Sequence, residues 1–247
     1  MKSLTPLILF SLFIHQGIFL TLLAQKSKPC YAQADRDSAL ACYHNYFDQS
    51  LKYINGREYK PYHYPTHENP YLNDRQGEGT LYMEGRTYPN KKLLYDIYKD
   101  LLIVNPEFYE LSNIYIQLKQ SEVDSFDISF DHINFRLIHY KEAYENLKAG
   151  YYQCIYKSDN TTLLLKHYAI KSSDESLTTY LKKTQRYLFY EGKYHDISKR
   201  KQLFKVLHLH KKAVKRECHK IRHSYKNMSE SELINLMQFI DNLSLTQ

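Results

Sequence analysis

Tryptophan is absent from this chain of 247 residues, and glycine and proline are scarce, with 7 of each. So few glycines and prolines exclude collagen-like, elastic and flexible-linker proteins. The chain contains no Gly-x-Ser-x-Gly, no His-Glu-x-x-His and no phosphate-binding glycine loop, so no common catalytic signature is present. The chain is rich in tyrosine, with 25 residues. Its composition of 43% hydrophobic and 25% charged residues is typical of a folded protein.

The N-terminus carries the one apolar run that is long enough to matter for targeting. A basic start precedes an apolar stretch from Leu4 to Leu23, and Ala24 is a small residue that suits a signal-peptidase site. We therefore expect residues 1–24 to be a cleaved signal peptide, and the mature protein to be exported to the periplasm or the cell surface. An uncleaved anchor is the alternative, although the polar break at His15-Gln16 argues against a permanent span. No second apolar run of spanning length exists, so we expect no transmembrane span after cleavage.

Four cysteines in an exported chain allow three disulfide connectivities. Cys30 and Cys42 are close enough in sequence to close a small loop at the mature N-terminus, and this is the disulfide that we predict. Cys154 falls in an apolar strand pattern and Cys218 on an apolar helical stripe, so buried free thiols are the alternative for these two.

The pattern of residues 51–197 is typical of antiparallel strands, because short runs of Tyr, Ile, Leu, Thr and Phe alternate with turn signals. Recurring Asn-Gly-Arg, Glu-Gly-Arg and Glu-Gly-Lys tripeptides predict tight strand-to-strand turns at Gly56, Gly85 and Gly192. Residues 25–50 form a predicted helical lead-in, and residues 198–247 have helical spacing. The expected strands are 79–83, 93–98, 101–104, 113–118, 125–130, 133–139, 150–157, 161–170, 187–190 and 194–197.

These patterns predict an α+β fold, in which an antiparallel β meander carries a C-terminal helical segment packed on it. The meander is either a curved sheet or an open barrel or sandwich. Ser229-Glu230-Ser231-Glu232 is a capping box, which opens the last helix.

Several hairpin patterns resemble uncharacterised exported β-rich proteins of Bacteroidota. The likeness lies in residues 55–59, 79–82, 94–101 and 150–156 and in the lysine-rich residues 199–207, and it covers most of the mature chain. The resemblance implies export. That family has no assigned activity, so it implies no catalytic or binding residue.

His63, His67 and Glu68 are metal-ligand types that lie within six residues of one another. Pro65 breaks the helical spacing that a helix-borne zinc site needs, so we expect a polar loop there and neither a metal nor another cofactor. Residues 59–71 are crowded with tyrosine, which suits a recognition surface as well as a structural role, and both interpretations stay open.

Asp96, Asp124, Asp127 and Asp131 fall on or beside predicted strands. Two facing carboxylates on a sheet could hydrolyse a glycosidic bond, so an envelope hydrolase is the alternative function. A charged solvent face is the simpler interpretation of these residues. Whether the chain is an enzyme is left open by the sequence.

Positive charge is concentrated in one segment. Residues 199–226 hold eleven lysines and arginines against Glu217 alone, whereas the rest of the mature chain holds 22 basic and 26 acidic residues. Because like charges at i, i+4 repel, a solubilising role alone does not explain this density. We therefore predict a non-enzymatic binding or assembly module with a basic docking helix. The candidate binding residues are Lys211, Lys212, Lys215, Arg216, Lys220 and Arg222.

The expected partner of this helix is an anionic envelope surface or another envelope protein. Nucleic acid is disfavoured, because exported proteins meet little of it. The apolar stripe of the segment, formed by Leu203, Leu207, Val214 and Ile221, should pack on the sheet and leave the cations outside. The sequence does not determine the oligomeric state.

Overall fold

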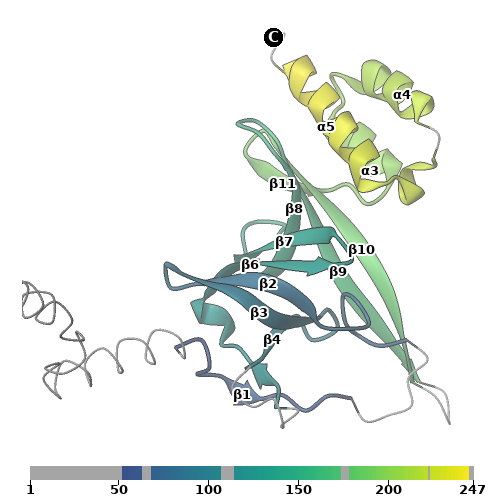
Figure 1. Cartoon of the computed structure of the whole chain (residues 1–247). Coiled ribbons are helices and arrows are strands. Elements are labelled where there is room, and N and C mark those ends of the chain that lie inside the picture. Colours follow the sequence, from purple (N-terminus) through teal and green to yellow (C-terminus); the bar gives the residue numbers. More distant parts are fainter. Residues whose placement is uncertain (1–51, 63–67, 107–113, 174–177, 222, 245–247) are drawn as a thin grey trace, which may run out of the picture. The chain divides into compact units, whose positions relative to one another are not determined.

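The computed structural model describes residues 52–62, 68–106, 114–173, 178–221 and 223–244 (Figure 1). All of the strands and helices described here belong to one compact unit, Tyr53–Gln247. The predicted signal peptide 1–24, the helical lead-in 25–50 and the Cys30–Cys42 disulfide lie outside the described residues.

Within the described residues, eleven strands form one open antiparallel sheet, which confirms the predicted fold class. Their order is β1-β5-β4-β3-β2-β6-β7-β8-β9-β10-β11. On one side of β2 lie β3, β4 and β5 in succession, with β1 at the edge, and on the other side lie β6 to β11 in succession. The strands are β1 (Arg57–Glu58), β2 (Gly77–Met83), β3 (Arg86–Asp96), β4 (Leu101–Asn105), β5 (Ile116–Gln117), β6 (Val123–Phe130), β7 (Ile133–Tyr140), β8 (Gly150–Lys157), β9 (Thr162–Ser173), β10 (Thr178–Tyr190) and β11 (Lys193–Asp196).

Two of the three predicted glycine turns join neighbouring strands. Gly85 lies between β2 and β3 with φ 72°, and Gly192 lies between β10 and β11 with φ 79°. The glutamate before each glycine also has positive φ, as a two-residue type I′ turn requires.

The hairpin predicted at Gly56 is wrong. β1 follows Gly56 directly and pairs with β5, which is far away in the sequence. A Cβ on Gly56 would come within 1.8 Å of the carbonyl oxygen of Gln117. The glycine is therefore needed for a close approach of two backbones, which the local sequence cannot reveal.

Three α-helices follow the sheet in the described part of the chain: α3 (Arg200–Val206), α4 (Lys211–Lys220) and α5 (Glu230–Ser244). The backbone N–H of Ser229 donates to Glu232 Oε2 (2.8 Å), and the N–H of Glu232 donates to Ser229 Oγ (3.2 Å), which confirms the capping box. Short 3₁₀ turns occur at Gln120–Glu122 and Tyr225–Asn227. None of the described helices is long and apolar enough to cross a membrane.

Two large buried clusters hold these elements together. The first joins the central strands through residues such as Leu81, Tyr95 and Phe126. The second joins the end of the sheet, including Leu188 and Ile197, to all three helices. The helices are therefore part of a common core with β9 to β11.

The structure extends β9 and β10 well beyond their predicted bounds. β9 continues to Ser173, and β10 begins at Thr178, nine residues before the predicted strand 187–190. The added residues are mostly polar, and only Tyr180 among them is buried, so they lack the apolar alternation by which a strand is recognised. Pairing along the neighbouring strand, as between Ile170 and Leu181, fixes their conformation instead.

A substitution at Gly79 tests the register in which β2 pairs with β6. A Cβ at this position would lie 1.9 Å from the carbonyl oxygen of Asp127, so we expect Gly79→Ala to push the strands apart and lower the free energy of unfolding by about 3 kcal/mol. At Gly85 a Cβ would meet nothing within 4 Å, so Gly85→Ala should cost only about 1 kcal/mol through its positive φ. Urea unfolding followed by circular dichroism measures both, and equal losses would contradict the assigned register.

Candidate functional site

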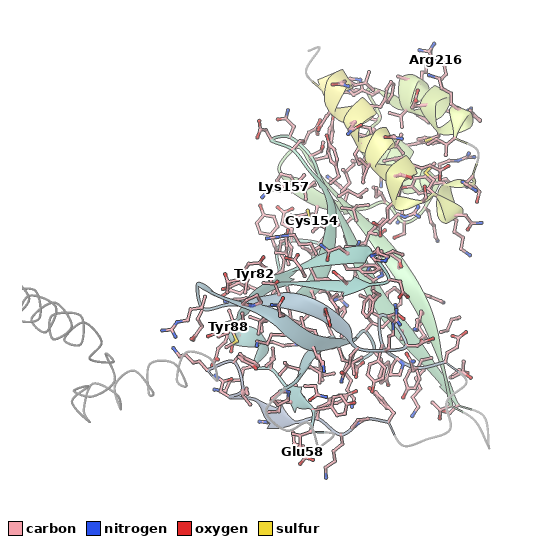
Figure 2. All side chains as sticks on the ribbon, in the orientation of Figure 1. Glu58, Tyr82, Tyr88, Cys154, Lys157 and Arg216 are labelled. Atoms are coloured by element: carbon pink, nitrogen blue, oxygen red, sulfur yellow. The ribbon has the colours of Figure 1, made fainter. Side chains whose placement is uncertain are left out.

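The predicted binding residues lie on the exposed side of α4. Lys211, Lys212, Lys215 and Arg216 are exposed, and no salt bridge to them occurs among the described residues. Figure 2 shows Arg216 on the side of α4 that faces away from the sheet. The group formed by these four residues is called the basic face below.

The two remaining predicted residues differ from this group. The Lys220 ammonium lies 2.8 Å from the Glu217 carboxylate, so its charge is partly neutralised. Arg222 lies outside the described residues.

The apolar side of the basic segment is buried. Leu203, Leu207, Val214 and Cys218 belong to the cluster shared with α5 and the end of the sheet, and Ile221 is partly buried against it. The chain leaves helical geometry between α3 and α4, so the stripe belongs to two short helices and not to one continuous helix.

Polar contacts fix α5 to the sheet. The carboxylate of Asp241, only 8% exposed, accepts hydrogen bonds from the hydroxyls of Thr161 (2.6 Å) and Tyr156. At the other end of α5, Gln153 of β8 donates to the Glu230 carboxylate (3.0 Å). α5, which shares a buried cluster with α4, is therefore held to the sheet by hydrogen bonds at both of its ends as well as by apolar packing.

The four carboxylates of the alternative hydrolase site lie in separate environments. Asp124 pairs with Lys141 (2.8 Å), Asp127 accepts from the Tyr82 hydroxyl (3.1 Å), and Asp131 pairs with Arg75. Asp96 is buried among tyrosines. None of the four lines the cavities found in the described part of the chain.

Asp96 organises the described tyrosines of residues 59–71. Its Oδ2 accepts from the hydroxyls of Tyr59 (2.9 Å) and Tyr62 (2.7 Å), and its Oδ1 accepts from the backbone N–H of Tyr98 and Lys99. Burial, reinforced by hydrogen bonding, raises the pKa of Tyr59 and Tyr62 well above the ordinary value. The Lys99 ammonium lies 4.6 Å from the centre of the Tyr62 ring. These tyrosines therefore have a structural role.

A partly buried carboxylate, Asp100, pairs with a lysine of the sheet. Lys166 of β9 lies 2.6 Å from Asp100 Oδ2 and donates to the carbonyl oxygen of Tyr151 (3.0 Å). Burial lowers the pKa of Lys166, and Asp100 partly opposes this effect. Gly150 makes room for the pair, because a Cβ there would lie 2.2 Å from Asp100 Oδ2.

A groove of ≈ 680 Å³ lies between β9, β10 and the start of α5. In its lining, His167 Nε2 is 2.6 Å from Gln153 Oε1, and Thr184 Oγ1 is 3.3 Å from His167 Nδ1. Because the Glu230 carboxylate can only accept, it fixes the amide of Gln153, and His167 must donate through Nε2. Burial, with a smaller effect of Lys166, lowers the pKa of His167 to about 4, so the imidazole is neutral near pH 7.

A second cavity, ≈ 540 Å³ in volume, is largely aromatic. Tyr140, Tyr144, Tyr194 and Phe189 line it, and the hydroxyls of Tyr140 and Tyr194 are 2.7 Å apart. A third cavity of ≈ 560 Å³ lies beside α3 and includes His195 and His208.

The sequence analysis did not single out Gln153, Lys166 or His167, and it named Glu230 only as part of the capping box. A usable signal was present, because Gln153, Lys166 and His167 each interrupt an apolar strand run where a polar residue needs a partner. The partners come from other elements, so the sequence could indicate a buried polar residue but not its contact.

Some of the remaining cysteines and candidate metal ligands lie among the described residues, and others do not. Cys154 and Cys218 are free thiols, and burial raises the pKa of both. His63 and His67 lie outside the described residues, and Glu68 is exposed. No group of three metal-ligating side chains occurs among the residues that are described.

The lowered pKa of His167 predicts that the stability of the fold depends on pH. Its pKa is lower in the folded chain than its ordinary value of 6.5, so the unfolded chain binds more protons between pH 6.5 and pH 4. Its contribution to stability is complete above pH 6.5 and should decrease by roughly 2–3 kcal/mol as the pH falls to about 4. Urea unfolding across this range should show a flatter profile for His167→Gln than for the wild type. His208→Gln, at an exposed position, is the control, and parallel profiles for all three proteins would contradict the assignment.

Comparison of the chain with protein-family models, with curated proteins and with solved structures found no match. The resemblance to exported proteins of Bacteroidota stays an expectation.

Proposed function

We propose that this protein is an exported, non-enzymatic binding or assembly module of the cell envelope, which docks on an anionic surface through the basic face of α4. The observation that carries this proposal is the exposure of Lys211, Lys212, Lys215 and Arg216 on a helix whose apolar side is buried. The N-terminal apolar stretch followed by Ala24 supports export.

The basic face opposes the stability of its own helix. Lys211 and Lys212 occupy the first turn of α4, which contains no acidic residue, although the N-terminus of a helix favours negative charge. Lys211 also lies four residues before Lys215, and Lys212 four residues before Arg216, so like charges face each other along the helix. These interactions cost a few tenths of a kcal/mol each, which a purely solubilising surface does not require.

The docking is peripheral. Val214 and Cys218 are buried beneath the basic face, so α4 has no free apolar side to insert into a bilayer. Each basic residue near an anionic surface contributes roughly 1 kcal/mol, and the contribution decreases with added salt. The alternative of hydrolysis by sheet carboxylates lacks comparable support, since Asp96, Asp124 and Asp127 are each held by different partners.

Charge reversal of the basic face tests the proposal directly. The variant with Lys211, Lys212, Lys215 and Arg216 all changed to Glu should fold normally, because the four side chains are exposed. Its partition onto phosphatidylglycerol vesicles at low salt should fall about a hundredfold or more in a sedimentation assay. The matched control reverses four exposed lysines elsewhere, Lys148, Lys157, Lys171 and Lys193, and changes the net charge equally. Equal losses for both variants would show that net charge alone matters and that no docking face exists.

A variant with only two substitutions tests the effect of the basic face on binding separately from its effect on stability. Lys211→Glu combined with Lys212→Glu places two carboxylates at the N-terminus of α4, so the free energy of unfolding should rise by about 0.5–1 kcal/mol. The same variant should bind the vesicles less tightly than the wild type. Urea unfolding and vesicle sedimentation measure the two effects. If stability rises while binding is unchanged, the basic face is only a solvated surface.

A further inference from the structure

β10 is much longer than the strand that covers its outer side. β10 has 13 residues, but β11 pairs only with Tyr187 to Tyr190 (Figure 1). After Ile197 the chain turns away to form α3. The part of β10 before Arg186 therefore has β9 on one side and no paired strand on the other, within the described residues.

The direction of the backbone groups along β10 follows from the hairpin. Tyr190 and Lys193 close the two-residue turn, so the N–H and C=O of the even-numbered residues of β10 point toward β11. The backbone contacts of Arg186 confirm this direction. Its carbonyl oxygen accepts from the N–H of Ile197 (2.9 Å), and its N–H donates to Ser198 Oγ (3.0 Å). By the same alternation, Lys182 and Thr184 present their N–H and C=O groups on this side. In the described part of the chain these four groups have no hydrogen-bond partner.

The groove of ≈ 680 Å³ borders this open edge. Ser198, Lys226 and Met228 line it beside Lys182 and Thr184, and its volume is in the range of ligand sites in proteins. The Arg186 guanidinium fixes the segment of Tyr225 and Lys226 beside the groove, because it donates to the carbonyl oxygens of Tyr225 (2.5 Å) and Lys226 (3.2 Å).

The charges around the groove favour an acidic ligand. Lys183 and Lys226 both line it, and neither ammonium has a salt-bridge partner among the described residues. Lys182 pairs with Asp74, which is itself exposed. The one carboxylate in the lining is that of Glu230, which Gln153 holds.

We propose that the open edge of β10 at Lys182–Thr184 binds an extended, acidic peptide segment of another protein, which adds to the sheet as a strand and places side chains in the adjoining groove. Backbone hydrogen bonds of this kind supply affinity, and the groove supplies specificity. A second copy of this chain is a poor occupant, because pairing β10 with itself would bring the lysines of the two copies together. The same lysines therefore disfavour self-association and select an acidic strand.

The first experiment measures binding of a probe peptide to the full chain. The probe is a short fluorescent peptide that alternates glutamate with valine, and its binding is followed by fluorescence anisotropy. Two matched peptides serve as controls: one carries lysine in place of glutamate, and the other is N-methylated at alternate backbone amides. The proposal expects saturable binding of the acidic probe alone. Absence of saturable binding, or equal binding of the N-methylated peptide, would overturn it.

Amide hydrogen exchange locates the binding site. In the free protein the amides of Lys182 and Thr184 should exchange quickly, whereas the amide of Lys183 is protected by β9. Addition of the acidic probe should slow the exchange of Lys182 and Thr184. If the probe binds without slowing the exchange of these two amides, it binds elsewhere and the proposed edge is wrong.

Two variants test the edge and its charge separately. Thr184→Pro removes an outward N–H and leaves the ladder to β9 intact, so it should weaken probe binding about fivefold or more. Lys183→Glu combined with Lys226→Glu changes the charge only, should keep the fold, and should also weaken binding at least fivefold. Lys211→Glu combined with Lys212→Glu, on α4, should bind the probe as the wild type does. Wild-type affinity in the Lys183, Lys226 variant would overturn the proposal even if Thr184→Pro failed to fold.

Discussion

Buried tyrosines bring hydroxyl groups into the core of this protein, and the hydroxyls of Tyr59, Tyr95 and Tyr225 find acceptors there, whereas those of Tyr88 and Tyr151 have none in the described part of the chain. An unpaired buried hydroxyl costs about 1–3 kcal/mol, which is a large share of the stability of a typical domain. Asp96 and Asp100 solve the problem at the end of β3 and in the turn to β4. Asp96 accepts from Tyr59 and Tyr62, and Asp100 accepts from Tyr95 while it pairs with Lys166 of β9. One short turn thus ties β3 both to the residues around β1 and to the far half of the sheet.

The pairing of other carboxylates shapes the surface as well. Asp241 and Glu230 accept hydrogen bonds that join α5 to the sheet. Asp127 pairs with Arg136 of β7, and Asp124 pairs with Lys141, which follows β7. Among the described residues, the one salt bridge to a lysine or arginine of α4 is that of Lys220 with Glu217. The positive charge therefore remains on the outside, on helices that the core holds in a fixed position.

The two proposed interaction surfaces share a charge sign but differ in physical character. The basic face of α4 acts mainly through side-chain cations, because backbone groups beyond the first turn of a helix are hydrogen-bonded within it. Such a surface suits an extended anionic layer and depends strongly on salt. The edge of β10 offers backbone donors and acceptors at fixed spacing, which select an extended chain. The two surfaces can therefore be tested independently with different probes.

The sequence by itself determined the strand runs that become β4, β6, β7 and β8, the type I′ turns at Gly85 and Gly192, the capping box at Ser229 and the density of cations in α4. Each of these depends on neighbouring residues or on composition, so it is visible locally. Only the tertiary structure decided the role of Gly56, the full length of β10, and the contacts of Lys166 and His167. The physical reason is that these features depend on groups from distant strands and helices: a close backbone approach, a pairing strand or a buried polar partner is defined by position in space, and the local pattern of residues does not encode it.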